Sequence, residues 1–354
     1  MVATILAVAS CSASPPPPSE LQSVLNALTS SGVVGAIATL DDSNATTVTT
    51  SGVSNRNDGR LIGDNDRVRI GSVTKTFTAS LVLQLVAEGK IDLDAPIERY
   101  LPGLLRSEIY GDTITVRQLL QHRSGLPEYA GEPGADEWAA ANEGRTLTPS
   151  EAIALALGKP AQFEPGTSFV YTNTNYIVLG MLVEAVTERS YADELQSRIL
   201  DPLSLYDTYL PPTAERDIKG DHLSGYQDLG NGLTDVTRIE PSVPWSAGAM
   251  ISTGKDLNAF WRALLDGHVV PSKELAEMTS PQVATTEAGG LGFGMGVVAT
   301  ELSCGVTYIG HSGVIRGYQT MSGATQNRAF TITISALPKD DPDIAAMISR
   351  AVCT

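Results

Sequence analysis

Short runs of β-branched and alternating apolar residues lie near both ends of the chain. Such runs, bounded by Gly, Asp, Asn and Ser, predict β-strands. The predicted strands are residues 33–40, 46–53, 68–70, 292–299, 306–309, 319–322 and 330–336. Turn-forming residues between the first two strands predict a hairpin.

The middle of the chain has the wider apolar spacing of helices. Residues 72–88 are apolar nearly all round, which predicts a buried helix, and Gly89 provides a natural C-terminal stop. Further helices are predicted at residues 21–28, 115–122, 149–157, 175–187 and 341–353. The pattern predicts an α/β lobe built from residues 20–78 and 246–354, with a mostly helical lobe, residues 79–245, inserted between them.

Composition narrows the choice of function. The 354 residues carry a net charge of −16, and the sequence pI is about 4.6. This acidity argues against non-specific nucleic-acid binding, which needs a cationic surface, and we interpret it as a solubility feature. No apolar run approaches the roughly 20 residues that a membrane-spanning helix needs.

Residues 1–19 have the character of an export leader. A short apolar stretch from Val2 to Ala9 precedes small residues, although no Lys or Arg precedes it. The sequence from Val8 to Cys11 resembles a bacterial lipoprotein cleavage box, in which Cys11 would carry a lipid anchor. Pro15 to Pro18 would then form a stiff spacer. Cleavage elsewhere, or a non-native start, is the alternative.

Two cysteines remain if Cys11 is removed or lipidated. Export would allow Cys304 and Cys353 to form a disulfide, whereas two buried free thiols are expected in a reducing compartment.

The sequence contains two Ser-x-x-Lys motifs. Ser72 and Lys75 stand at the start of the predicted buried helix, where residues i and i+3 share one face. A helix N-terminus offers N–H groups to a developing oxyanion, and burial would lower the lysine pKa enough to make it a base. Ser252 and Lys255 are explained by an ordinary helix start. Spacing alone therefore does not single out Ser72.

Two further motifs carry candidate chemistry. Tyr171 and Asn173 form the one Tyr-x-Asn among eleven tyrosines, and they combine a proton shuttle with an amide donor and acceptor. The alternative interpretation is that Tyr171 is a loop residue packed on the core and that Asn173 forms a turn. His311, Ser312 and Gly313 follow a strand-like run, where a strand could offer the N–H of Val314 to an oxyanion. The alternative for His311 is a structural histidine.

Together the three motifs, in this order, resemble those of the penicillin-recognising serine hydrolases. The resemblance extends to residues 114–129, 163–184, 245–253 and 301–318, and it covers nearly the whole chain from about residue 20. It is greatest to secreted D-alanyl-D-alanine carboxypeptidases that share the class C β-lactamase fold. The resemblance implies an α/β (α+β) fold, with an antiparallel sheet flanked by helices and an inserted helical lobe.

The resemblance also implies roles for individual residues. Ser72 would be the acylated nucleophile, Lys75 its general base, and Tyr171 the group that protonates the leaving group and then activates water. Asn173 would bind the substrate amide, and His311 would line the site and fix the charge state of Tyr171. Cys304 would pair with Cys353.

The sequence departs from the carboxypeptidase pattern at two places. Val314 stands where a hydroxyl residue is usual, and residues 294–304 contain no basic residue to hold a substrate carboxylate. We hypothesise that Arg316 binds this carboxylate; the alternative is a surface arginine. If no cation binds it, uncharged esters or amides become better substrates.

The leading prediction is an exported acyl-transfer hydrolase of D-alanyl peptides, with β-lactams as acylating ligands. A β-lactamase, a short-chain carboxylesterase and a D-amino-acid amidase share the same chemistry. A non-catalytic β-lactam sensor would not need Ser72, Lys75 and Tyr171 together. The four histidines have no paired ligand spacing and no phosphate-binding glycine loop is evident, so we expect neither a metal nor a cofactor.

Overall fold

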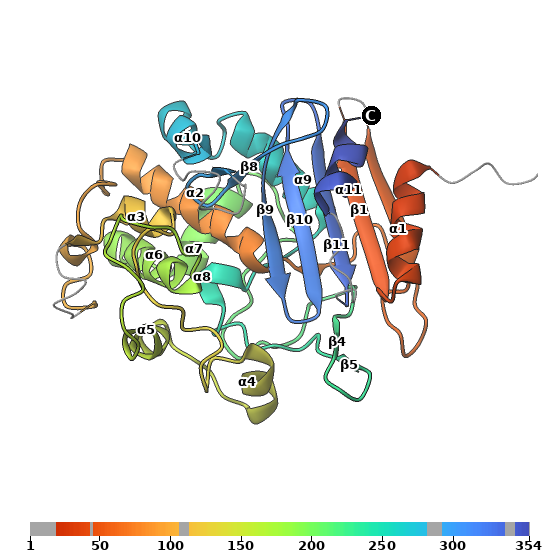
Figure 1. Cartoon of the computed structure of the whole chain (residues 1–354), viewed down its shortest axis with the longest axis horizontal. Helices are drawn as coiled ribbons and strands as arrows, with labels where there is room; N and C mark the ends of the chain where they lie inside the picture. The colour runs from red at the N-terminus through yellow and green to blue at the C-terminus, as the bar shows by residue number, and fades with distance from the viewer. Residues whose placement is uncertain (1–18, 43–44, 106–112, 282–291, 337–343, 354) are drawn as a thin grey trace, which may run out of the picture.

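The computed structural model describes residues 19–42, 45–105, 113–281, 292–336 and 344–353. Its centre is a seven-stranded antiparallel sheet with strand order β2-β1-β11-β10-β9-β8-β7 (Figure 1). The strands are β1 (Gly35–Asp41), β2 (Thr46–Gly52), β7 (Gly292–Phe293), β8 (Val298–Glu301), β9 (Thr307–Ile315), β10 (Tyr318–Ala324) and β11 (Ala329–Ser335). The α/β fold with an antiparallel sheet is confirmed. The proposed leader and Cys11 lie outside the described residues.

The two ends of the chain meet in this sheet. β1 pairs with β11 in a register that joins Gly35 to Ser335 and Asp41 to Ala329. Every residue of β11 is buried, so this strand is covered on both faces. Along it, apolar Phe330, Ile332 and Ile334 alternate with Thr331, Thr333 and Ser335, so one buried face is apolar and the other carries small hydroxyl groups.

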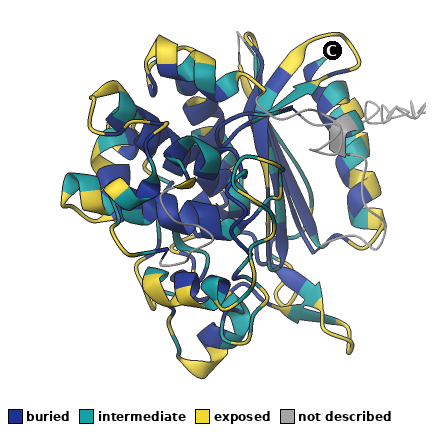
Figure 2. Ribbon diagram, turned by 60° about the vertical axis from the view of Figure 1, so that its left-hand side comes forward, coloured by how far each residue is buried: buried dark blue, intermediate teal, exposed yellow. Residues whose placement is uncertain are grey.

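Helices cover the sheet on both faces. α1 (Glu20–Ser30) and α11 (Ile344–Val352) pack on one face, where Leu25 and Ile348 belong to a common apolar cluster with Phe330 (Figure 1). α9 (Gly254–Leu265) packs on the other face, and Trp261 donates a hydrogen bond to Ser322 there. Figure 2 shows the buried strands enclosed between these layers.

Most of the remaining helices lie in the inserted segment. They are η2 (Ile97–Arg99), α3 (Val116–Leu120), α4 (Glu137–Glu143), α5 (Pro149–Leu157), α6 (Asn173–Thr187), α7 (Tyr191–Leu195) and η4 (Gln196–Leu200). α8 (Trp245–Gly248) begins at the last residue of the segment, and α10 (Ser272–Thr279) follows α9. The segment also holds a small hairpin, β4 (Tyr226–Asp228) with β5 (Leu233–Asp235). None of the helices in the described part of the chain has the length and apolar character needed to cross a membrane.

One buried helix links the two parts of the molecule. The 3-10 turn η1 (Gly71–Val73) leads into α2 (Thr74–Ala87), whose residues from Thr74 to Leu83 are all buried. This burial follows from a helix that is apolar all round. The predicted lobe boundary after residue 78 falls inside α2, so the helix belongs to both parts.

Two predicted strands differ from the structure in extent. Residues 292–299 contain a turn at Gly296, whose φ of +73° separates β7 from β8. The strand predicted at 306–309 is observed as Thr307–Ile315, because β10 pairs with residues 309–315. Polar His311 and Ser312 therefore belong to a strand that hydrophobicity alone ends too early.

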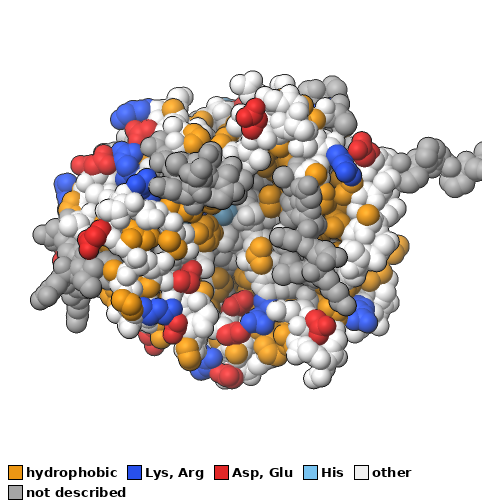
Figure 3. All heavy atoms as spheres, in the orientation of Figure 1, with side chains coloured by type: hydrophobic (Ala, Val, Ile, Leu, Met, Phe, Trp, Pro, Cys, Tyr) orange, Lys and Arg blue, Asp and Glu red, His pale blue; other side chains and the backbone are white. Residues whose placement is uncertain are grey.

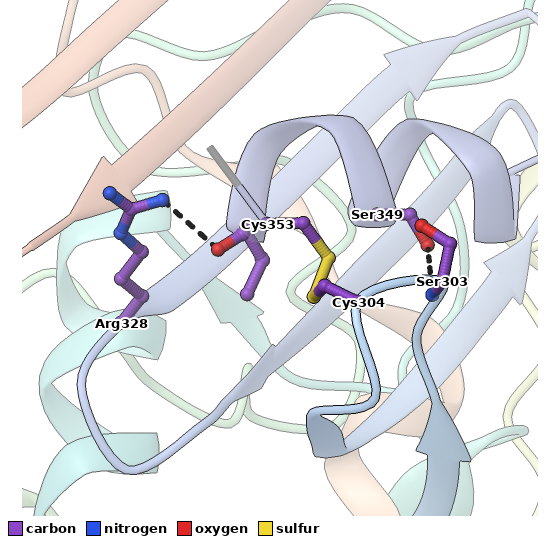
Figure 4. The surroundings of a disulfide bond; sticks show 6 residues. Ser303, Cys304, Arg328, Ser349 and Cys353 are labelled. Atoms are coloured by element: carbon purple, nitrogen blue, oxygen red, sulfur yellow. Dashed lines mark hydrogen bonds between the residues drawn. A yellow bond between two sulfur atoms is a disulfide. The ribbon is translucent and has the colours of Figure 1, made fainter.

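Cys304 and Cys353 are joined by a disulfide that closes a 49-residue separation. It ties the β8–β9 turn to the end of α11, next to a hydrogen bond from Arg328 to the carbonyl of Val352 (Figure 4).

Candidate active site

Ser72 is held between the sheet and the buried helix. The short strand β3 (Val68–Arg69) pairs with β6 (Ile251–Ser252) just before it. Gly71 has a φ of +51°, and a methyl group added there would lie 3.0 Å from the backbone N, C and O of Val314. Only glycine meets both conditions. Ser72 therefore stands in the 3-10 turn, against β9 and one turn ahead of α2.

Lys75 is fully buried and converges on Ser72. Its Nζ lies 3.0 Å from Ser72 Oγ, and it donates to Asn173 Oδ1 at 2.7 Å and to the carbonyl of Ala247 at 2.8 Å. Burial lowers its pKa to about 7, partly offset by the negative charge of Glu128. Near pH 7 a large fraction of Lys75 is therefore neutral and able to accept a proton from Ser72.

The second Ser-x-x-Lys motif has no such arrangement. Ser252 is buried on β6 and hydrogen-bonds to Thr208, while Lys255 is exposed in the first turn of α9. Thr253 caps that helix through the N–H of Asp256. The interpretation of Ser252 and Lys255 as part of an ordinary helix start is therefore correct.

Tyr171 faces Ser72 and Lys75 from the segment before α6. Lys75 Nζ lies 4.9 Å from the centre of its ring. Its buried hydroxyl has no hydrogen-bond partner of ordinary geometry in the described structure. Burial raises the pKa of Tyr171 well above its usual value, although the nearby Ser72 hydroxyl partly offsets this effect. Tyr171 is therefore protonated at neutral pH and can act as an acid.

Asn173 is the first residue of α6 and is fixed by Glu128, which the sequence did not single out. Both the backbone N–H and the Nδ2 of Asn173 donate to Glu128 Oε2, at 2.7 and 3.0 Å. This places the Asn173 amide oxygen toward Lys75. Glu128 lies in a segment that carries the family resemblance, but nothing in its own sequence context indicated a role.

β9 runs past Ser72 with one edge unpaired. β8 pairs with β9 only as far as Gly310, so residues 311–315 face η1 instead. A methyl group added at Gly313 would lie 1.9 Å from the carbonyl O of Ile70 and 3.0 Å from the N of Ser72. The backbones of Ser72 and Val314 therefore flank one small space, in which their N–H groups could stabilise an oxyanion.

His311 lies near Tyr171, with ring centroids 6.3 Å apart. Its Nδ1 is 2.5 Å from the carbonyl oxygen of Ser312, which leaves the buried Nε2 without a partner in the described structure. Burial, together with the nearby Lys75, lowers the pKa of His311 to about 4. The ring is therefore neutral at pH 7.

These side chains border a cavity of about 550 Å³. Figure 3 shows the face of the molecule seen in Figure 1. A hollow opens near its middle, with a histidine visible at the floor and hydrophobic side chains around it. The lining is Gly71, Ser72, Tyr129, Ala130, Ala135, Glu137, Phe169, Tyr171, Asn173, Val243, Pro244, Ala247, Gly248, Phe293, His311, Ser312, Val314 and Ile315. Among the residues that the structure describes, Glu137 is the one acidic residue of this lining, and no arginine belongs to it.

The structure does not support Arg316 as the ligand of a substrate carboxylate. Its guanidinium pairs with Asp136, donates to Gln227 at 3.2 Å, and lies 3.9 Å from Glu137. It also lies over the ring of Trp138. Two carboxylates already share this charge, and Arg316 is not part of the cavity lining.

Among the described residues, no group of three or more His, Cys, Asp or Glu side chains could hold a metal ion. Fold and constellation together define a class: hydrolases with a serine, a buried lysine and a tyrosine placed for acyl transfer.

Comparison with known proteins extends this class to a family. Residues 22–348 match the family model described as Beta-lactamase. The chain therefore belongs to the beta-lactamase family, and by that membership it is a serine hydrolase of the group that includes the penicillin-binding proteins.

Curated relatives include penicillin-binding protein 4 of Amycolatopsis lactamdurans, 31% identical over 62% of this chain and 56% of that protein. Penicillin-binding protein 4* of Bacillus subtilis is 27% identical over 85% of this chain and 67% of that protein. The chain thus spans between half and two thirds of the length of these two relatives.

Solved structures match over nearly the full length. A D-stereospecific amidohydrolase from Streptomyces sp. has a TM-score of 0.86 and 35% identity, covering 96% of this chain and 100% of its own. The D-amino acid amidase of Ochrobactrum anthropi SV3, in complex with D-phenylalanine, has a TM-score of 0.81 and 26% identity, covering 94% and 96%.

Proposed function

We propose that this protein hydrolyses amides and esters of D-amino acids through an acyl-enzyme on Ser72. The observation that carries the proposal is the convergence of Ser72, buried Lys75 and Tyr171 on a cavity whose lining, as far as the structure describes it, is mostly apolar and without arginine. The similarity to a D-stereospecific amidohydrolase and a D-amino acid amidase supports the choice of substrate.

In the acylation step, neutral Lys75 accepts the proton of Ser72 as Oγ attacks the substrate carbonyl carbon. The N–H groups of Ser72 and Val314 bind the oxyanion. Tyr171, which is protonated at neutral pH, gives its proton to the leaving amine as the C–N bond breaks. The Lys75 ammonium then returns a proton to Tyr171, so both groups regain their starting states.

Deacylation reverses these roles. A water molecule attacks the ester and passes its proton through Tyr171 to Lys75, and Ser72 Oγ is reprotonated as the acid leaves. Asn173 would bind the amide of the substrate. His311, which is neutral at pH 7, would place no second positive charge beside Lys75.

The substrate choice differs from the first sequence-based hypothesis, a D-alanyl-D-alanine carboxypeptidase. A carboxypeptidase must bind a free carboxylate, and here the described part of the cavity lining offers Glu137 and neither lysine nor arginine. Negative charge in the cavity repels a carboxylate and tolerates an amine or a neutral amide. Amide and ester substrates without a free carboxylate therefore fit the site better.

Penicillin-binding relatives favour β-lactams as acylating ligands of the same serine. The alternatives of a β-lactamase, a penicillin-sensitive peptidase and a carboxylesterase differ in how fast the acyl-enzyme is hydrolysed. We further propose that the protein is exported, with or without a lipid on Cys11, which is consistent with the leader-like sequence and the disulfide.

The testing experiment follows intact mass and product release with three compounds: D-phenylalanine amide, D-alanyl-D-alanine and benzylpenicillin. We expect hydrolysis of the amide in preference to the dipeptide, and loss of all reactions in Ser72→Ala. A stable penicillin adduct would identify a penicillin-sensitive enzyme, and consumption without an adduct a β-lactamase. Preferred hydrolysis of D-alanyl-D-alanine would overturn the amidase assignment in favour of a carboxypeptidase.

A further inference from the structure

Glu137 is an acidic side chain at the wall of the proposed active site. It is the first residue of α4, directly after the N-cap residue Asp136, and it lines the cavity together with Ala135 and Val314. Its side chain is 22% exposed. The Ser72–Lys75–Tyr171 chemistry described above makes no use of it.

The charge of Glu137 is only partly balanced. Arg316 forms its close ion pair with Asp136, whereas its Nε lies 3.9 Å from Glu137 Oε1, beyond hydrogen-bond distance. That Nε is buried and has no hydrogen-bond partner in the described structure. One guanidinium therefore serves two carboxylates, and Asp136 takes the larger share.

Arg69 is a further cation that interacts with Glu137, and it is fully buried. Its guanidinium donates to the carbonyls of Thr237 and Arg216, so its interaction with Glu137 is long-range. Burial raises the pKa of Glu137, while backbone N–H groups of Glu137 and Arg316 and the charge of Arg316 partly offset this effect. A cation arriving from the cavity would supply the missing partner.

The position of Glu137 defines which substrate group it can reach. Glu137 faces Arg316. Arg316 lies two residues beyond Val314, and two residues of extended chain span about 7 Å. The α-amine of a D-aminoacyl substrate is only two bonds from the reacting carbonyl and remains close to Ser72. An ammonium at the end of a flexible side chain can extend to Glu137.

We propose that Glu137 is a specificity-determining subsite that binds the side-chain ammonium of a basic D-amino acid, such as D-lysine or D-ornithine. The inference rests on the proposed D-amino-acid hydrolase activity. The protein would cleave amides of basic D-residues in preference to those of neutral residues of the same length. The alternative is a purely structural Glu137 that fastens α4 to the β9–β10 turn.

The test compares kcat/KM for the p-nitroanilides of D-lysine and D-norleucine, which differ only by the side-chain ammonium. We expect a wild-type ratio of about ten in favour of D-lysine, which corresponds to about 1.4 kcal/mol. The ratio should fall to about one in Glu137→Gln. It should rise in Arg316→Gln, which leaves Glu137 without its shared cation, and it should decline with salt in the wild type.

Two controls separate the possible outcomes. Glu143→Gln removes an exposed carboxylate from the same helix and should leave the ratio unchanged. N-acetylated D-norleucine p-nitroanilide reports the contribution of the α-amine, which Glu137→Gln should not alter. An equal loss on both substrates in Glu137→Gln would show a structural role and overturn the subsite.

Failure of the two proposals would look different. If the wild type hydrolyses D-norleucine p-nitroanilide but does not favour D-lysine, the subsite is wrong and the proposed function stands. If the wild type hydrolyses none of these anilides, nor D-phenylalanine amide, the proposed function fails and the subsite with it.

Discussion

The ring of Tyr171 is stacked on the imidazole of His122, with ring centroids 4.2 Å apart and ring planes inclined by 30°. His122 Nδ1 accepts hydrogen bonds from the N–H of Thr172 at 3.2 Å and from Asn175 Nδ2 at 3.3 Å. Burial lowers the pKa of His122 well below its ordinary value, so the ring remains neutral and its Nδ1 can accept. His122 thus positions Tyr171 from behind.

Replacing this acceptor should affect both stability and catalysis. His122→Phe keeps an aromatic surface under Tyr171 but leaves two buried N–H donors without a partner. We expect the free energy of unfolding to fall by about 1–3 kcal/mol, measured in urea, and kcat to fall more than KM rises. His268→Phe, at an exposed position, is the control. Unchanged kcat in folded His122→Phe would show that this stacking does not position Tyr171.

The pH dependence of the reaction should report Lys75. Its pKa of about 7 in the folded protein means that the neutral base disappears as pH falls below that value. We expect kcat/KM to be constant above pH 8 and to fall about tenfold per unit below pH 6. The pKa values of His311, about 4, and of His122, lower than usual, exclude them as the source. A profile that is flat from pH 5 to 9 would contradict a lysine base.

Glu128 should set the pH at which kcat/KM falls on the acidic side of the profile. Its negative charge raises the pKa of Lys75, so Glu128→Gln should move the acidic limb to lower pH and extend activity into more acidic solution. Glu132→Gln is the matched control, because Glu132 belongs to the same segment but pairs with Lys159. The prediction fails if the limb stays in place or moves to higher pH.

Substitution of Arg316 distinguishes a structural arginine from a carboxylate ligand. Because Arg316 pairs with Asp136 and Glu137, Arg316→Gln should lower the free energy of unfolding by about 1–3 kcal/mol. In a Glu137→Gln background, where no unmasked charge can repel the substrate, Arg316→Gln should leave the relative kcat/KM for D-alanyl-D-alanine and its C-terminal amide within about twofold. A selective loss on the free carboxylate in this double variant would restore the hypothesis that Arg316 binds it.

The disulfide should contribute measurably to stability. A closed loop of about 50 residues corresponds to about 4 kcal/mol in the chain-entropy treatment of the unfolded state. We expect the double substitution Cys304→Ser with Cys353→Ser to reduce the urea midpoint, and dithiothreitol to do the same to the wild type. A midpoint that is insensitive to dithiothreitol would mean that these thiols are free in the protein.

Sequence patterns predicted the elements whose burial is simple. The run after Ser72 predicted a buried helix, and residues 33–40 and 330–336 predicted strands, because their apolar content reflects burial directly. The strand containing His311 was predicted too short, because its polar residues face the site and break the apolar pattern. Functional constraint here overrides the local signal.

The candidate site was only partly predictable. Ser72, Lys75, Tyr171 and Asn173 were found through motifs, and the structure brings all four together. Glu128 and Glu137 were missed, because a single glutamate in a loop or at a helix start carries no periodic or spacing signal. The role expected for Arg316 depended on partners from a distant segment, and sequence proximity to Val314 could not reveal Asp136.

The close approach of Gly71 to Val314 also has a consequence for the order of biosynthesis. The nucleophile and the buried helix are made early, but their second oxyanion donor lies on β9, which is synthesised more than 200 residues later. β9 is in turn held by β10, and β10 by β11. A nascent chain that has only its first 300 residues therefore holds Ser72 and Lys75 without a complete reaction centre. Hydrolytic competence therefore requires the insertion of β9 and of the strands that hold it, and it cannot arise when Ser72 and Lys75 alone have been made.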